Sequence, residues 1–141
     1  ALPKYISGEI KPQEQDHAKA TFTKLLTKAD GHIDWNKPAE YIERMTRAFD
    51  PWPGTWTKTQ NHENTKSNIL KILKTHILHP TIGCANDPRP GALWLTEQGE
   101  LAVNANPGSL LLEQVHPEGR RPMNGKEFLN GHKEMTGTIL K

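Results

Sequence analysis

The feature that most constrains the fold is the run from Asp50 to Trp56, where two prolines, one glycine and two tryptophans follow a helix-like segment. Proline lacks the backbone N–H that a helix needs, and its ring clashes with the preceding turn, so no regular helix continues through Pro51 and Pro53. Tryptophan carries a large apolar surface that favours burial. We therefore predict a rigid, packed turn that leads from a helix into a strand.

The composition is that of a polar chain with material for one modest core. The chain has 141 residues, of which 34% are hydrophobic, and its mean hydropathy is −0.73. A chain of this length suits one domain and a connecting segment. The single cysteine, Cys84, excludes an internal disulfide and any zinc site that needs two thiolates, and it suits a reducing compartment. No apolar run is long enough to span a membrane and no segment has the pattern of a secretory signal, so we expect a cytoplasmic protein without a membrane partner.

Basic residues are concentrated in two parts of the chain, although the formal net charge is only +2. Residues 51–80 contain four basic side chains and one acidic, and residues 120–141 contain five basic and two acidic. Such stretches suit a polyanionic partner, and an ordinary solvated surface is the alternative explanation.

Two helices are expected. The first extends to about Ala48, with Asn36 as a candidate N-cap and Pro38 in the first turn, and Asp50-Pro51 ends it. Its apolar face is formed by residues at helical spacing, namely Ile42, Met45 and Phe49.

The second helix has a strong local signature near the end of the chain. Asn124 is its predicted N-cap and Glu127 completes a capping box. Gly131 stands where a helix-terminating C′ glycine belongs. We expect the tail after His132 to fray.

Short aliphatic runs between glycine- and proline-containing turns predict an antiparallel sheet or small barrel, with strands near 56–57, 69–78, 92–95, 101–103 and 110–115. Residues 60–67 and 79–90 are predicted loops.

Residues 1–24 are interpreted as an extended linker that includes the end of a preceding domain, because residues 11–17 include no apolar residue. The apolar side chains before it are Leu2, Tyr5, Ile6 and Ile10. The fold expected is thus mainly β, with two short helices and a barrel domain over residues 25–141.

Several stretches together resemble the C-terminal domain of methionyl-tRNA formyltransferase. They run from Ile33 to Glu40, from Arg47 to Gly54, from Glu113 to Met123 and from Phe128 to His132. Upstream, Leu2 to Tyr5 and residues 12–21 resemble the link between that family's two domains. The residues that form the structural signature are Asp34, Trp35, Pro51, Trp52, Pro53 and Gly54.

The resemblance implies a small OB-like antiparallel β-barrel at the C-terminal end of an enzyme. That enzyme transfers a formyl group from 10-formyltetrahydrofolate to methionyl-initiator-tRNA, and its catalytic N-terminal domain holds the folate and performs the chemistry. The partners implied for this chain are therefore the initiator methionyl-tRNA and the catalytic domain. The catalytic motifs are absent, so no catalytic residue and no cofactor are expected in this chain, and alone it should be inactive.

Two other functions are compatible with the same motifs. The chain could be the corresponding domain of an amino-sugar formyltransferase, in which case it should bind no tRNA at physiological salt. It could also be a structural domain that packs on the catalytic domain and stiffens it. The stretch from Gln114 to Met123 favours the tRNA enzyme.

Eight basic residues are candidates for contacts with tRNA phosphates. Arg120 and Arg121 form the best pair, because they occupy a predicted turn between a strand and a capped helix, and arginine can bind a phosphate with two hydrogen bonds. Each residue taken singly is also explained as ordinary solvated surface. The full set is Lys19, Lys24, Lys71, Lys74, Arg120, Arg121, Lys126 and Lys133.

Trp35, Trp52, Trp56 and Trp94 could stack on nucleotide bases, but we favour packing in the core or in turns. The seven histidines include no His-x-x-x-His pair, so we expect no metal site. Asp34 is interpreted as a capping or hydrogen-bonding residue rather than a catalytic acid.

Overall fold

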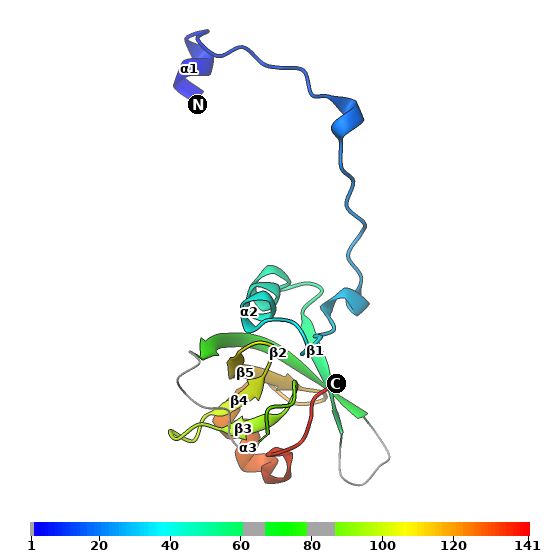
Figure 1. Ribbon diagram of the computed structural model, residues 1–141, viewed down its shortest axis with the longest axis vertical. Coiled ribbons are helices and arrows are strands. Elements are labelled where there is room, and N and C mark those ends of the chain that lie inside the picture. Colours follow the sequence, from blue (N-terminus) through cyan, green and yellow to red (C-terminus); the bar gives the residue numbers. More distant parts are fainter. Residues whose placement is uncertain (1, 61–66, 79–86) are drawn as a thin grey trace.

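The computed structural model describes residues 2–60, 67–78 and 87–141, and it is built around one curled antiparallel sheet (Figure 1). The strands lie in the order β1-β2-β5-β4-β3, and β6 pairs with the second half of β5. The prediction of a small, mainly β, barrel-like fold is confirmed, while the predicted loops at 60–67 and 79–90 lie mostly outside the described residues. The strands are β1 (Thr55–Gln60), β2 (Ser67–Leu78), β3 (Leu93–Leu95), β4 (Leu101–Asn104), β5 (Ser109–Pro117) and β6 (Met123–Asn124).

Helix α2 (Ala39–Ala48) ends where predicted but begins later than predicted. Asn36 is not its N-cap; Pro38 occupies that position. The reason is a competing turn: the Asp34 carboxylate accepts hydrogen bonds from both the backbone N–H and the side-chain amide of Asn36, at 3.1 and 3.0 Å. The predicted role of Asp34 as a hydrogen-bonding residue is therefore confirmed.

Helix α3 (Gly125–Gly131) has the predicted start and a different end. Asn124 accepts a hydrogen bond from the Glu127 N–H at 2.7 Å, and the Glu127 carboxylate accepts one from the Asn124 N–H at 3.2 Å. Gly131 is the last residue of the helix rather than a C′ residue, and His132 is the C-cap. The chain continues directly into a 3-10 turn, Lys133–Met135, so no left-handed residue is needed there.

The C-terminal tail is an integral part of the barrel, so the prediction that it frays is wrong. Residues 137–141 lie between β3 and β1: the Leu93 N–H donates to the Thr138 carbonyl at 2.9 Å, and Lys58 and Lys141 exchange two backbone hydrogen bonds of 2.7 and 3.0 Å. Leu140 is buried in the core. The tail stays in place because it forms backbone hydrogen bonds with both edges of the half-barrel, whose N–H and C=O groups would otherwise be unpaired.

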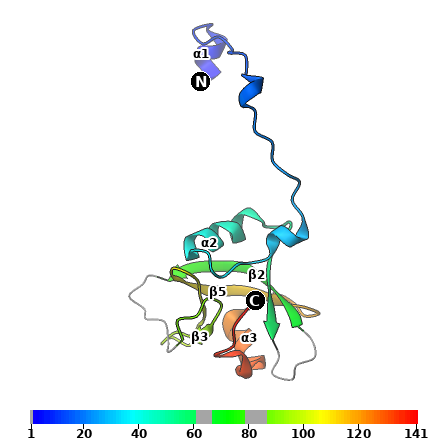
Figure 2. The same cartoon turned by 45° about the vertical axis from the view of Figure 1, so that its right-hand side comes forward.

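Aliphatic side chains from the strands fill the barrel, and α2 and α3 lie on opposite sides of the sheet (Figures 1 and 2). Along β5, the buried Leu110, Leu112 and Val115 face inward. From α2, Ile42 reaches the core, whereas Met45 and Phe49 on the predicted apolar face are half-buried.

A buried asparagine on β4 joins three parts of the structure. The side-chain oxygen of Asn104 accepts hydrogen bonds from the Trp94 indole N–H at 2.9 Å and from the Ser109 hydroxyl at 3.1 Å. Its amide N–H donates to the Asp87 carbonyl. Both Asn104 and Trp94 are buried, so their polar groups cannot bind bulk water, and these hydrogen bonds take the place of that hydration.

Residues 2–26 leave the barrel as a separate arm that carries helix α1 (Leu2–Ile6) at its far end (Figures 1 and 2). No side chain of the described arm, residues 2–26, is buried. Large apolar groups are nevertheless present, and Phe22 and Leu25 are 95% and 90% exposed.

Candidate functional site

The turn between α2 and β1 is fixed in place, but its apex is open to solvent. The Gly54 N–H donates to the Phe49 carbonyl at 2.9 Å, with Gly54 at a φ of 75°. A Cβ on Gly31 would lie 2.0 Å from the Gly54 oxygen, so the turn and the segment that precedes α2 are in direct contact. Trp52, at the apex, is 56% exposed. The predicted turn is present, and the prediction that it is packed is wrong for Trp52, which leaves more than half of its surface in solvent.

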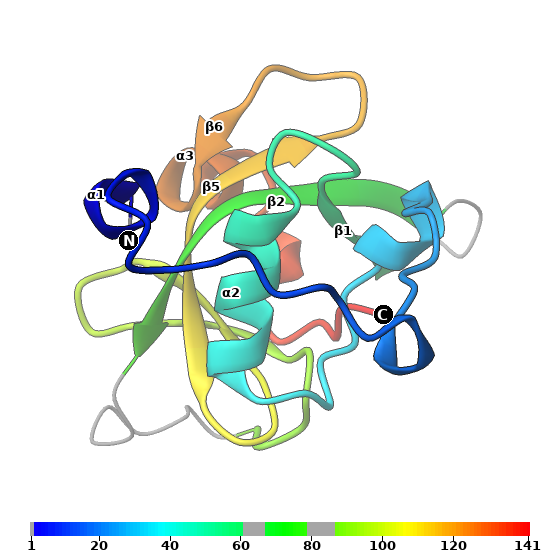
Figure 3. The same ribbon diagram turned by 90° about the horizontal axis from the view of Figure 1, so that it is seen from above.

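Lys71 and His116 lie beneath this turn on the outer face of the sheet. In the strand register Trp56 of β1 opposes Lys71 of β2, which in turn opposes His116 of β5. Residues directly opposite one another in antiparallel strands share a face. Lys71 and His116, together with Asp50 and the two prolines of the turn, line a hollow of about 110 Å³. Figure 3 shows the connection from α2 to β1 reaching over β2 toward β5.

The structure divides the predicted phosphate contacts into neutralised and free residues. Three lysines already have carboxylate partners: Lys19 with Asp16 at 3.3 Å, Lys74 with Glu113 at 2.7 Å, and Lys24 with Asp30. Within the described residues the other five form no ion pair, and all five are exposed. They are Lys71, Arg120, Arg121, Lys126 and Lys133.

Arg120 and Arg121 are the free pair that the fold brings together. They occupy the turn between β5 and β6, where the Arg120 N–H donates to the Pro117 carbonyl at 3.1 Å. Both line a hollow of about 450 Å³ beside α3, and Arg120 also lines a neighbouring hollow of about 290 Å³. His132 lines both hollows. This side of the barrel therefore presents two guanidinium groups and an imidazole, with the Glu127 carboxylate lining the first hollow and those of Glu118 and Glu134 lining the second.

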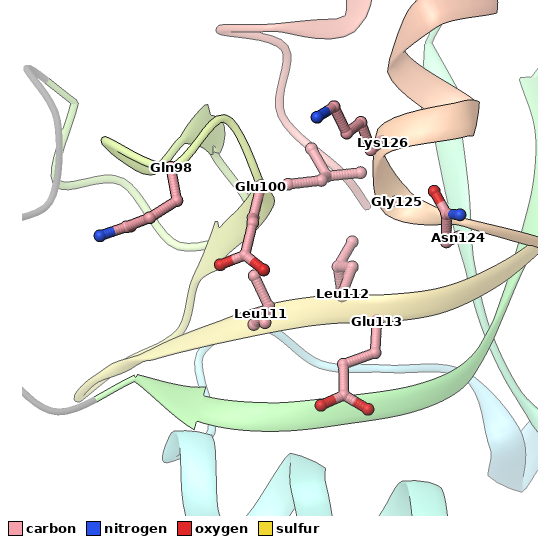
Figure 4. Close-up of a pocket in the computed structure, with 9 residues that line it drawn as sticks. Gln98, Glu100, Leu111, Leu112, Glu113, Asn124, Gly125 and Lys126 are labelled. Atoms are coloured by element: carbon pink, nitrogen blue, oxygen red, sulfur yellow. The ribbon is translucent and has the colours of Figure 1, made fainter.

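Lys126 belongs to a different and electrically balanced surface, shown in Figure 4. It lines a hollow of about 460 Å³ between the start of α3, β5 and the turn before β4, and Glu100 and Glu113 line the same hollow. The Glu113 carboxylate turns toward β2, where Lys74 binds it. The carboxylates make this hollow a poor position for a phosphate.

The strongest local electrostatic effects involve acidic residues that have cationic partners. Hydrogen bonding to the Lys24 ammonium, supported by Thr27, lowers the pKa of Asp30 to about 2. The Arg89 guanidinium likewise lowers the pKa of Asp87 to about 2. Both carboxylates are thus fully charged at neutral pH, and both act as structural partners of the cations rather than as acids or bases.

Three of the four tryptophans pack as predicted. Trp35 and Trp94 are buried, and the indole N–H of Trp35 donates to the Thr57 hydroxyl at 3.0 Å. Trp56 is half-buried against the His32 ring, with ring centroids 4.4 Å apart, and its N–H donates to the Lys28 carbonyl at 2.9 Å. The exposure of Trp52 was not predicted from the sequence. The position of His116 on the outer face agrees with strand alternation, because it follows the buried Val115.

In the described part of the chain, no cluster of three or more His, Cys, Asp or Glu residues could hold a metal ion. His62, His79 and Cys84 lie outside the described residues. Within the same described ranges, no helix has both the length and the apolar character needed to cross a bilayer.

Comparison with known proteins shows strong similarity to formyltransferases. The family model for the formyl transferase C-terminal domain matches residues 25–133. The methionyl-tRNA formyltransferase of Roseiflexus castenholzii is 45% identical over 99% of this chain, and that of Chloroflexus aurantiacus is 41% identical over 92%. The chain spans only about two fifths of these relatives, covering 41% and 39% of their lengths.

A solved structure supports the fold as well. A HypX variant from Aquifex aeolicus matches with a TM-score of 0.58 over 96% of this chain and 23% of its own, at 14% sequence identity. Since the family model covers most of the chain, and the curated relatives cover nearly all of it, this chain belongs to the formyl transferase C-terminal domain family.

Proposed function

We propose that this chain is the tRNA-holding C-terminal part of a methionyl-tRNA formyltransferase. The similarity to relatives of that name across nearly the whole chain carries the proposal, and it favours the tRNA enzyme over an amino-sugar formyltransferase. Formyl transfer from 10-formyltetrahydrofolate is then the work of the preceding catalytic domain in the cytoplasm. The chain alone should transfer no formyl group to methionyl-tRNA.

In this proposal the barrel binds the phosphate backbone of initiator tRNA through its free basic residues. Arg120 and Arg121 are the central pair, because they are exposed, share one turn and have no acidic partner among the described residues. A guanidinium can hold a phosphate with two parallel hydrogen bonds. Binding through phosphates releases counterions, so the affinity should fall steeply as salt is raised.

The test is fluorescence anisotropy of labelled initiator tRNA titrated with the chain at several salt concentrations. Replacing Arg120 and Arg121 by alanine should weaken binding and flatten the plot of log affinity against log salt by about 1.4–1.8, the sum for two phosphate contacts. The Lys19→Ala/Lys24→Ala double variant is a matched control, because it removes the same formal charge from two ion-paired lysines. It should leave the slope nearly unchanged.

The outcomes separate the competing functions. Equal slopes for the two double variants would remove the arginine pair from the interface. An absence of binding by the unaltered chain even at low salt would contradict independent tRNA binding and favour the amino-sugar or structural alternative.

A second role is favoured by the arm. We propose that residues 1–24 form the link to, and the end of, the catalytic domain, and that the arm packs on that domain. The apolar side chains of Leu2, Tyr5 and Ile6 recur at the spacing of one helical face on α1, yet all are exposed. Exposed apolar groups on one face gain free energy when a partner covers them.

The arm can be tested with a separately produced catalytic domain of this enzyme. Isothermal titration should detect a complex, and Tyr5→Ala/Ile6→Ala should weaken it. Lys4→Ala, on the same helix, provides a control that leaves the apolar face intact. Equal affinities for the two variants would contradict packing through this face.

A further inference from the structure

We propose that Trp52 and Lys71 form a niche for one unpaired nucleotide of the RNA partner, with its base stacked on the Trp52 indole and its phosphate at the Lys71 ammonium. This inference rests on the proposed function and assigns it a site that is separate from the arginine pair. Three observations carry it: the isolated exposure of Trp52, the rigidity of its turn, and the unpaired cation beneath it.

Trp52 differs from every other tryptophan in the chain. The indole N–H groups of Trp35, Trp56 and Trp94 all donate to protein acceptors, at 3.0, 2.9 and 2.9 Å respectively. Trp52 makes no hydrogen bond to any described residue, and it exposes more than half of its surface. An indole that is left in water on a folded domain keeps an apolar face available for a flat aromatic ring.

The turn holds the backbone of Trp52 in a fixed position before any ligand arrives. Prolines flank Trp52 on both sides and restrict the backbone dihedral angles there. The Gly54 N–H bond to Phe49 closes the turn, and the contact with Gly31 anchors it to the barrel. A group that is already ordered loses little conformational entropy on binding, so a larger share of the stacking free energy appears as affinity.

The charges around the turn suit a nucleotide better than an apolar ligand. Lys71 is exposed, lines the hollow beneath the turn and forms no ion pair within the described residues. His116 adds a second nitrogen group on the same side. Asp50 also lines the hollow, so the phosphate is expected at the Lys71 side of the turn. An aromatic platform beside a cation is the arrangement by which single-stranded nucleic acids are held.

A protein partner is less well supported at this position. Stable protein interfaces bury on the order of 1,200–2,000 Å² and have an apolar centre. Around Trp52 the exposed neighbours are Asp50 and Pro51, and the sheet below presents Lys71. One indole in a polar setting matches a single stacked base in size.

The test compares variants of the chain in two binding assays, with labelled initiator tRNA and with a short unstructured single-stranded RNA. Trp52→Ala should weaken both complexes by about 5- to 150-fold, the range measured for loss of one base–aromatic stack, and leave the salt slope unchanged. Trp52→Phe keeps an aromatic ring and should retain most of the affinity. Lys71→Ala should instead flatten the salt slope by about 0.7, as expected for one phosphate of a single strand.

A perfectly paired RNA duplex is the control ligand, because it offers no unpaired base along its length. Trp52→Ala should bind it as the unaltered chain does. Failure of the unaltered chain to bind tRNA would contradict the proposed function. Normal tRNA binding by Trp52→Ala, or an equal loss toward the duplex, would overturn the niche and leave the proposed function standing. Circular dichroism and thermal unfolding of each variant verify that the barrel remains folded.

Discussion

Replacing Asn104 by alanine should be among the most destabilising single changes in the barrel. The substitution removes the acceptor of the Trp94 indole N–H, and both residues are buried, so water cannot replace the lost bond. A buried donor left without a partner costs about 1–3 kcal/mol, and loss of the bond to the Asp87 carbonyl adds about 1 kcal/mol. We expect a loss of about 2–4 kcal/mol in the free energy of unfolding, or a fall of roughly 6–15 °C in Tm.

Urea and thermal denaturation followed by circular dichroism measure this loss. A double-mutant cycle with Trp94→Phe isolates the hydrogen bond between Trp94 and Asn104, because phenylalanine has no N–H group that could be left without an acceptor. In the Asn104→Ala background, Trp94→Phe should cost about 1–2 kcal/mol less than it does in the unaltered chain. Strict additivity, within about 0.3–0.5 kcal/mol, would refute the assignment of Asn104 as the acceptor that this indole depends on.

Three further predictions concern the tail, a glycine and the response to acid. Leu140→Ala should lower the free energy of unfolding in urea by about 2–5 kcal/mol, because the side chain is buried, whereas a frayed tail would give no change. Gly91→Ala should lower the free energy of unfolding clearly more than Gly99→Ala. Both glycines have a positive φ, which costs an alanine about 1–2 kcal/mol. Only at Gly91 would the new Cβ also lie 2.5 Å from a backbone oxygen, that of Leu140. Hydrogen bonding to Lys24 lowers the pKa of Asp30 in the folded protein to about 2, below the ordinary aspartate value of 3.8, so the unfolded chain binds more protons and this stabilisation is lost as pH falls from about 4 to 2. Lys24→Ala should therefore lose less stability than the unaltered chain between pH 5 and pH 2.5 in thermal unfolding, and identical acid responses would contradict the role of this pair.

Features that depend on neighbouring residues in the sequence were predictable. The capping box of α3 needs only Asn124 and Glu127, three positions apart, and the strands follow from aliphatic runs bounded by turn residues. The start of α2 was mispredicted even though it is local, because Asp34 and Asn36 form a turn of their own that competes with capping.

Features that depend on distant partners were not predictable. Leu140 is buried because Gly91 and Lys58 lie beside the tail in space, far from it in the sequence. The same reason limited how much of the candidate site could be predicted from the sequence. Lys74 is neutralised by Glu113 from the next strand in the sheet, whereas Lys71, three residues earlier, has no such partner among the described residues, and sequence alone does not distinguish the two. The exposure of Trp52 was missed because an apolar side chain in a turn is covered only where another element reaches it.

The strand-like pairing of residues 137–141 has a consequence for how this domain emerges from the ribosome. Residues 137–141 pair with the strand edges at Lys58 and at Leu93. A nascent chain in which β5 and α3 have emerged but this stretch has not therefore has two strand edges with unpaired N–H and C=O groups. Closure must come after Lys141 has left the exit tunnel, which makes it a late, long-range step rather than a progressive one. During that interval the two unpaired edges leave the nascent barrel open to mispairing with another chain.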